Sequence, residues 1–251
     1  MIYAAFRSIG AYIPPKIMSN ADFEKIIDTS DEWITKRTGI KERRIANEGE
    51  ASSDLGARAG ELAIERAGIS KEEIDLVICA TVTPDFLCMP STACLIAAKL
   101  GLPNVMAFDV SAACTGFVYA LNVAKAFIES GMKKNVLIVG AEKYSAILDY
   151  TDRTTCFLFG DGAGAAIISA TNDKSESIID INCSSDGNYE DLIKTPGGGS
   201  KNPCSQEVLE NKMACIKMKG NETFKLAVKT LTSDVKTMLE KHNLTNEDIN
   251  H

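Results

Sequence analysis

Hydrophobic and polar positions follow two alternating periods along the chain, and this pattern predicts alternating helices and strands. Residues 74–83 form an almost continuous apolar run rich in β-branched side chains, which is typical of a strand buried on both faces of a parallel sheet. Apolar residues recur at helical spacing over 55–67, behind Ser53 and Asp54 as candidate caps and ahead of Gly68 as a stop. Further strands are expected over 105–110, 136–141 and 164–170, and further helices over 91–100 and 115–130. The order predicts an α/β fold built from βαβ units.

Two helices have distinctive patterns. Thr29 and Glu32 have the spacing of a capping box, which opens a short helix that ends near Gly39. The helix over 115–128 is apolar on nearly every side, with only Asn122 and Lys125 strongly polar. Such a helix is normally buried all round, so we expect it to lie between packed sheets.

An internal repeat divides the chain. Residues 69–75 (ISKEEID) resemble residues 244–250 (LTNEDIN), and each copy follows a long amphipathic helix. The second helix, 221–242, has one apolar face, made of Phe224, Ala227, Val228, Leu231, Val235, Met238 and Leu239. The first copy leads into the buried strand, whereas the second leads into the end of the chain. We therefore expect two related halves, 1–170 and 171–251, with the second incomplete; the alternative is that the helix simply ends the fold.

Composition narrows the function classes. Hydrophobic residues make up 45% of the chain and charged residues 24%, which excludes a disordered protein. No apolar run reaches the roughly 18 residues of a membrane span, and a net charge of −7 argues against a nucleic-acid partner. None of the eight cysteines forms a C-x-x-C pair, so we expect reduced thiols in a cytoplasmic protein and no metal site. We also expect no cofactor.

One cysteine has a setting that the other seven lack. The predicted strand 105–110 is followed by Ser111 and two alanines, and Cys114 then stands where the apolar helix begins. A helix N-terminus favours the thiolate, and small neighbours leave room for a substrate, so Cys114 is a candidate nucleophile. The alternative is a packed thiol at a helix start. The two histidines, His242 and His251, do not have the setting of a catalytic base.

Two other patterns suggest ligands less specifically. Residues 159–165 (FGDGAGA) fit G-x-G-x-x-A, but they precede a strand instead of opening a helix, so we expect a tight, closely packed turn and no dinucleotide. Trp33 and Arg37 lie one helical turn apart and could stack on a base and hold a phosphate. The spacing alone favours the alternative, an ordinary packed aromatic residue beside an exposed arginine, because neighbours one turn apart are common on helices.

Taken together, several stretches resemble the β-ketoacyl-acyl-carrier-protein synthase III family of the thiolase-like superfamily. They are 28–34 (DTSDEWI), 37–40 (RTGI), 111–117 (SAACTGF) and 159–164 (FGDGAG), with Met218, Gly220, Asn221 and Phe224. The resemblance covers the whole chain. It implies a thiolase-like fold of two pseudo-repeated α/β halves in five layers. It also implies a homodimer in which Phe86 and Met89 lie on a loop near the acyl pocket of the partner subunit.

The resemblance further implies an activity. Members of the family condense an acyl-CoA primer, usually acetyl-CoA, with malonyl-acyl carrier protein to start type II fatty acid synthesis. In the family, the cysteine that matches Cys114 carries the acyl group as a thioester. The residues that contact the adenine end of CoA match Trp33, Arg37 and Arg153. Those that line the pantetheine tunnel match Met218, Gly220 and Phe224. Thr154 stands where the family commonly has glycine. The family's catalytic histidine and asparagine are expected beyond His251.

Lysines near one helix start suggest how the carrier protein binds. Lys225 and Lys229 lie one turn apart on a helix expected otherwise to face the core, and could attract an acidic carrier protein. Two other functions stay open at this point. One is a related starter enzyme of secondary metabolism, and the other is a non-catalytic relative that binds CoA or acyl groups.

Overall fold

The computed structural model describes residues 1–102 and 104–249, which form two compact units. Unit 1 comprises Met1–Ile147 and Phe157–Ile181. Unit 2 comprises Leu148–Cys156 and the described residues from Asn182 onward. The predicted halves, 1–170 and 171–251, stay a prediction about the architecture. The short segment Leu148–Cys156 packs with unit 2 although it lies within the sequence of unit 1.

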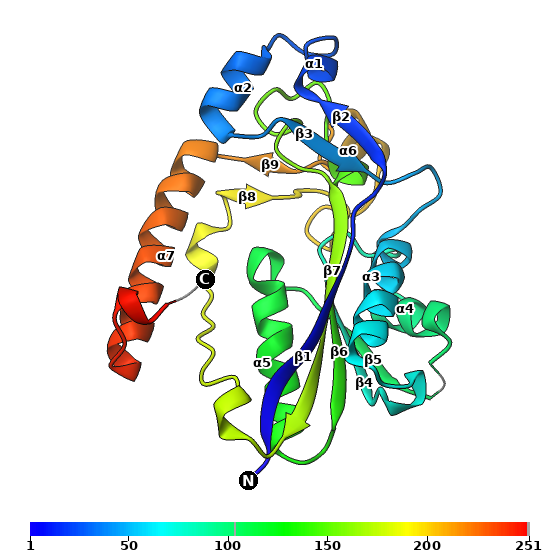
Figure 1. Ribbon diagram of the computed structural model, residues 1–251. Helices are drawn as coiled ribbons and strands as arrows, with labels where there is room; N and C mark the ends of the chain where they lie inside the picture. The colour runs from blue at the N-terminus through cyan, green and yellow to red at the C-terminus, as the bar shows by residue number, and fades with distance from the viewer. Residues whose placement is uncertain (103, 250–251) are drawn as a thin grey trace. The chain divides into compact units, whose positions relative to one another are not determined.

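A five-stranded mixed sheet forms the centre of unit 1, in the order β1-β7-β6-β4-β5 (Figure 1). Its strands are β1 (Tyr3–Tyr12), β4 (Leu76–Ala80), β5 (Met106–Val110), β6 (Asn135–Lys143) and β7 (Asp161–Thr171). β4 runs parallel to β5 and β6, as the apolar run predicted, and all its residues are buried. β7 pairs antiparallel with both β6 and β1.

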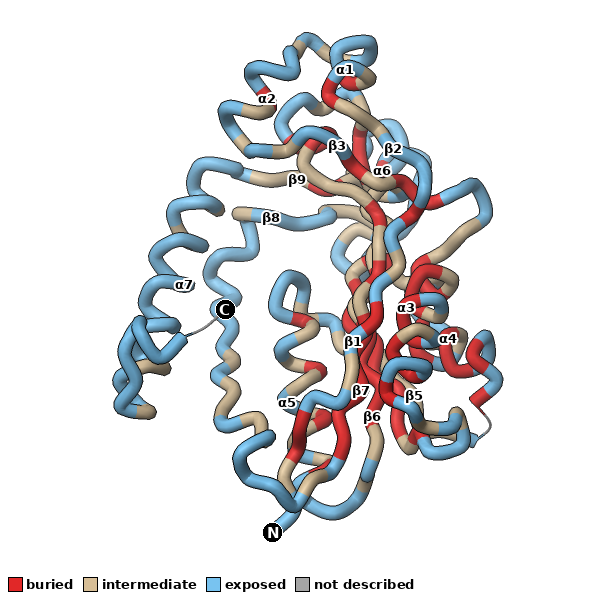
Figure 2. The backbone as a smooth tube through the Cα atoms, viewed as in Figure 1, coloured by how far each residue is buried: buried red, intermediate tan, exposed pale blue. Residues whose placement is uncertain are grey.

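Helices cover both faces of this sheet. α3 (Ser52–Ala67) and α4 (Thr92–Leu100) pack on one face, and α5 (Gly116–Glu129) packs on the other (Figure 1). Alternate residues of β4 point to opposite faces, so Val77 and Cys79 join the α3–α4 core while Leu76, Ile78 and Ala80 join the α5 core. Burial is concentrated in the sheet and in the helix faces against it (Figure 2).

The rest of unit 1 is a small subdomain and several short turns. β2 (Lys16–Ser19) and β3 (Glu42–Ile45) pair antiparallel, with α1 (Asn20–Phe23) and α2 (Asp31–Thr38) between them. The 3-10 turns are η1 (Lys71–Glu73), η2 (Ala113–Thr115), η3 (Tyr144–Ile147) and η4 (Lys174–Glu176). α2 ends at Gly39 as predicted, but its cap is Ser30, whose hydroxyl accepts from the Trp33 N–H at 3.1 Å, and not Thr29. Ser30 lies three residues before Trp33, which is the spacing of an N-cap bond.

Unit 2 consists of short elements and one long helix. They are η5 (Gly187–Tyr189), β8 (Ile193–Lys194), α6 (Gln206–Glu210), β9 (Lys217–Met218), α7 (Gly220–His242) and η6 (Asn246–Asp248). β8 and β9 pair antiparallel in a two-stranded sheet. No helix among the described residues is long and apolar enough to cross a membrane.

The sequence repeat recurs in local backbone geometry. α3 ends at Gly68 and α7 ends at Asn243, both in the left-handed region, with φ of 63° and 54°. A 3-10 turn follows in each case, and its third residue closes a capping box: Glu73 accepts from the Ser70 N–H, and Asp248 accepts from the Thr245 N–H, both at 2.8 Å. Asn250, the last residue of the second copy, lies outside the described residues.

Two expectations about burial were wrong. α5 is buried on one face only, through Gly116, Ala120, Ala124 and Ile128, whereas Val118 is 40% exposed. Most of its other residues are apolar, but within unit 1 a single sheet packs against the helix. α7 has no buried residue at all, so it does not face a core. An apolar pattern predicts which face a helix can bury, but burial itself requires a partner element.

The glycine-rich stretch is also different from the predicted turn. Gly162 and Gly164 lie inside β7, paired with Glu142 and Gly140 of β6. Only Gly160, just before β7, fits the expected close packing, since a Cβ there would lie 2.9 Å from the Arg44 carbonyl oxygen, whereas a Cβ on Gly164 would meet nothing within 4 Å.

Candidate active site

Cys114 lies at the carboxyl end of the parallel strands of unit 1. β5 ends at Val110, η2 carries Cys114, and α5 starts at Gly116. The thiol is free and exposed. In parallel α/β sheets this edge is where ligands bind, because loops leave the strands there and helix N-termini converge. The structure therefore places the predicted nucleophile where a substrate can reach it.

The turn that carries Cys114 is sharp and closely packed. Ala113 has a φ of 45°, a left-handed conformation that costs a residue with a side chain roughly 1–2 kcal/mol. The Thr115 N–H donates to the Ala112 carbonyl oxygen at 3.2 Å and closes the turn. A Cβ on Gly116 would stand only 3.1 Å from the Ala80 Cβ, so glycine lets the start of α5 approach the end of β4.

A partly buried carboxylate, which the sequence analysis missed, fastens the neighbouring loop. Glu142 is the residue before the last of β6, which pairs with β4, and its oxygens accept from the Val82 N–H at 2.9 Å and from the Thr83 hydroxyl at 2.6 Å. Burial raises the pKa of Glu142, although these hydrogen bonds favour its charged form. The only signal for it in the sequence is its place directly after a predicted buried strand.

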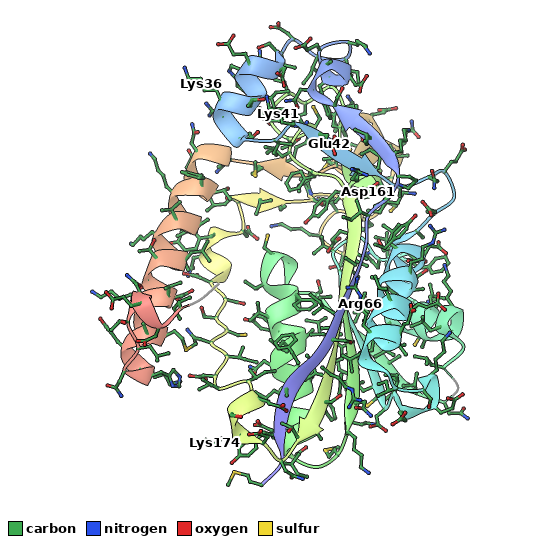
Figure 3. The ribbon with its side chains drawn as sticks, viewed as in Figure 1. Lys36, Lys41, Glu42, Arg66, Asp161 and Lys174 are labelled. Carbon is green, nitrogen blue, oxygen red and sulfur yellow. The ribbon has the colours of Figure 1, made fainter. Side chains whose placement is uncertain are left out.

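Tyr144 lies in the electrostatic neighbourhood of both groups. Burial, the Glu142 carboxylate and the Cys114 thiolate all raise the pKa of the Tyr144 phenol. Its ring stacks on Phe159 with centroids 4.7 Å apart. Asp161, at the start of β7 beside β3 (Figure 3), accepts from the Ser145 N–H at 2.9 Å and from the Ala46 N–H at 2.8 Å. These contacts fix the segment after β6 close to Cys114.

The loop expected at the dimer contact has an anchored base and an exposed tip. Asp85 accepts from the Ser53 N–H at 2.8 Å and from the Ser53 hydroxyl at 2.6 Å, at the start of α3. Phe86 is 53% exposed and Met89 is 79% exposed. Large apolar side chains on an anchored loop are suited to contact with another surface. Their place near a partner's acyl pocket stays a prediction.

The indole and guanidinium expected at the adenine of CoA do lie together. The Arg37 Cζ lies 5.5 Å from the Trp33 ring centroid, and the Phe157 ring meets the indole edge-on with centroids 5.5 Å apart. Trp33 stays 37% exposed. The pair is thus a supported, partly open aromatic platform, and its contact with CoA stays a prediction.

The other predicted CoA residues belong to unit 2. Arg153 is exposed on the segment Leu148–Cys156, Met218 is in β9, and Gly220 and Phe224 lie in the first turns of α7. Phe224 is 69% exposed. Lys225 and Lys229 are both exposed on α7, but the helix around them does not otherwise face the core, which corrects that part of the prediction. His242 ends α7, and His251 lies outside the described residues.

Comparison with known proteins adds a family to this geometry. Residues 108–187 match the family model of 3-oxoacyl-[acyl-carrier-protein (ACP)] synthase III. A β-ketoacyl-[acyl-carrier-protein] synthase III of Aliarcobacter butzleri is 99% identical over 251 residues, which cover all of this chain and 75% of that protein. The chain belongs to the β-ketoacyl-[acyl-carrier-protein] synthase III family.

Other members of the synthase III family agree in sequence and in fold. The enzyme of a Sulfurovum species is 67% identical over 250 residues, which cover 74% of it. The crystal structure of the Aquifex aeolicus 3-oxoacyl-[acyl-carrier-protein] synthase III superimposes with a TM-score of 0.88 at 44% identity, over 98% of this chain and 74% of that one. These synthase III structures are thiolase-like α/β proteins, as the fold prediction stated.

Proposed function

We propose that this chain carries the acyl-transfer site of a β-ketoacyl-acyl-carrier-protein synthase III, with Cys114 as the nucleophile. The observation that carries the proposal is an exposed thiol on a strained strand-to-helix turn, in a chain that belongs to this family. The substrate classes follow from the names of the relatives. The reaction joins an acyl-CoA primer, with acetyl-CoA as the expected one, to malonyl-acyl carrier protein, and starts fatty acid synthesis.

The first half-reaction transfers the acyl group to the enzyme. The Cys114 sulfur, as thiolate, attacks the thioester carbonyl; its bond to carbon forms as the carbon–sulfur bond to CoA breaks. CoA leaves as a thiolate and takes up the proton that Cys114 lost. The N-terminal N–H groups of α5 favour negative charge beside Cys114, a contribution of about 0.3–2 kcal/mol. Because the thiol is exposed, its sulfur can reach and attack a bound acyl donor.

The second half-reaction forms the carbon–carbon bond. Malonyl-carrier protein loses carbon dioxide, and the carbanion that results attacks the acyl thioester. The 3-oxoacyl-carrier protein is released and the Cys114 sulfur is freed as thiolate, so atoms and charge balance. Acyl-CoA is consumed as a substrate, and this chemistry calls for no cofactor. The proposal includes a homodimer and a cytoplasmic setting, where free thiols such as the eight of this chain stay reduced.

The proposed binding residues are those that the family resemblance assigns to CoA. Trp33, Arg37 and Arg153 would hold its nucleotide end. Met218, Gly220 and Phe224 would line the path of the pantetheine arm. The exposed lysines Lys225 and Lys229 would attract the acidic carrier protein.

Labelling of the full-length protein tests the proposal. Incubation with radiolabelled acetyl-CoA, without malonyl-carrier protein, should place label on the peptide that contains Cys114. Cys114→Ser should abolish labelling, because an unassisted hydroxyl is a far weaker nucleophile. Cys94→Ser is a matched control, since Cys94 is also exposed and lies in the first turn of α4. Label on Cys94, or full labelling of Cys114→Ser, would refute the assignment.

A further inference from the structure

Asp149 is a buried carboxylate four residues before Arg153. Its residue is only 9% exposed. Its Oδ1 accepts from the Thr151 N–H at 2.9 Å, from the Thr151 hydroxyl at 2.7 Å and from the Lys212 ammonium at 2.9 Å. Lys212 also donates to the Thr151 hydroxyl oxygen at 2.6 Å. The carboxylate therefore closes a turn just before Arg153 and links this turn to Lys212, which follows α6.

A second turn, closed in the same way, holds the other side of Arg153. The Asp152 Oδ1 accepts from the Thr154 N–H at 2.9 Å and from the Thr154 hydroxyl at 2.6 Å. The Lys217 ammonium lies 3.9 Å from an oxygen of Asp149 and 3.9 Å from an oxygen of Asp152. Arg153 thus stands between two carboxylate-closed turns that share one cation. Thr154, which replaces the family's glycine, has its hydroxyl bound to Asp152.

The same ion pairs reach the strand that carries Met218. Lys217 and Met218 form β9, and α7 begins at Gly220 directly after it. Lys212 has a φ of 50°, an unusual backbone conformation for lysine, in the turn that connects α6 to this strand. The two segments of unit 2 that would contact acyl-CoA, at Arg153 and at Met218, are therefore joined through the Asp149 carboxylate.

We propose that Asp149 is a positioning residue for the acyl donor, which holds Arg153 at a fixed spacing from the Lys217–Met218 strand. This inference rests on the proposed function, because it assumes that Arg153 and Met218 contact CoA. A donor that reaches both residues depends on that spacing. A donor that reaches only Met218 does not.

The protonation behaviour of the carboxyl supports a permanent network. Although its desolvation opposes ionisation, hydrogen bonds from Lys212 and Thr151 lower the pKa of Asp149 to about 2. The carboxylate is therefore charged throughout the range in which the enzyme would be assayed, and its two lysine partners stay bound.

The test compares two donors with Asp149→Asn in the full-length protein. Asparagine keeps the volume but loses the attraction for Lys212 and Lys217. The rate of Cys114 acetylation is measured with acetyl-CoA and with acetyl-pantetheine, which lacks the nucleotide. We expect the half-saturating concentration of acetyl-CoA to rise about tenfold, the effect of weakening one charge-assisted hydrogen bond. That of acetyl-pantetheine should change less than about twofold, and the maximal rate should stay the same.

Control variants separate positioning from a general structural role. Asp191→Asn removes an exposed ion pair with Lys194 in the same unit and should leave the half-saturating concentration of each donor unchanged. Lys212→Gln breaks the same link from its other end, and should reproduce the selective effect even if Asp149→Asn folds poorly. The inference would be overturned if the half-saturating concentrations of both donors rose equally, or if that of acetyl-CoA did not change. If the unmodified protein is not acetylated at Cys114, the proposed function fails as well.

Discussion

Gly116→Ala should impair both stability and the proposed acyl transfer, because it forces α5 away from β4 just after Cys114. The added Cβ would lie 3.1 Å from the Ala80 Cβ, a few tenths of an ångström inside ordinary contact. Overpacking of this kind typically costs about 1–3 kcal/mol. The intrinsic helix preference of alanine over glycine returns at most about 1 kcal/mol, and less at the first helical residue. The steric cost is therefore the larger effect, and we expect a net loss of roughly 1 kcal/mol.

The shift also moves Cys114, which lies two residues earlier on the same turn. Displacement of a reacting atom by a fraction of an ångström slows an oriented reaction, so we expect acetylation of Cys114 to slow by about tenfold or more. The assays are urea unfolding and the rate of labelling by acetyl-CoA. Gly164→Ala is the matched control, since a Cβ there meets nothing within 4 Å.

The decisive experiment is the double variant Gly116→Ala/Ala80→Gly. Removal of the Ala80 Cβ relieves the clash, so the two substitutions should couple by about 1 kcal/mol or more and labelling should recover in part. Ala80→Gly alone should destabilise, because glycine weakens a strand and leaves its packing unfilled. Strictly additive effects on unfolding, with no recovery of labelling, would refute the packing argument.

Three further predictions concern charged groups. Burial raises the pKa of Glu142 above its ordinary value of 4.5, so the folded state holds the proton more strongly than the unfolded state, and the stability of the protein should fall as pH rises above 4.5. Melting curves from pH 4 to 8 should therefore show the unmodified protein losing stability relative to Glu142→Gln as pH rises. The pKa of Asp149 is shifted in the opposite direction, so the stability that its carboxylate contributes should be lost as pH falls from 3.8 toward about 2. Acid unfolding of Asp149→Asn should therefore lack this loss of stability. Lys225→Glu with Lys229→Glu should raise the Michaelis constant for malonyl-carrier protein and leave that for acetyl-CoA alone, and equal effects on both would contradict docking at this face.

Much of the central sheet could be predicted from local pattern. The apolar run before Thr83 is β4, and it is buried on both faces because helices cover both sides of the sheet. Cys114 was identified because small residues between a strand and a helix are a local feature. The repeat was visible for the same reason, since an end cap and a capping box each involve neighbouring residues.

What the sequence pattern missed depends on distant partners. Glu142 looks like any polar residue after a strand, and only the parallel pairing of β6 with β4 brings its carboxylate to the Val82 N–H and the Thr83 hydroxyl. The Asp149 network likewise joins residues more than sixty positions apart, which no periodicity signals.

The sequence by itself therefore determined most of the helices, the buried strands, the strand-to-helix turn that carries Cys114 and the family to which the chain belongs. Tertiary structure decided which apolar faces are covered, as the open side of α5 and the exposed α7 show. It also decided which charges meet. The physical reason is the same in both cases: periodicity and capping are set by neighbours within a few residues, whereas burial and ion pairing are set by whatever the folded chain brings alongside.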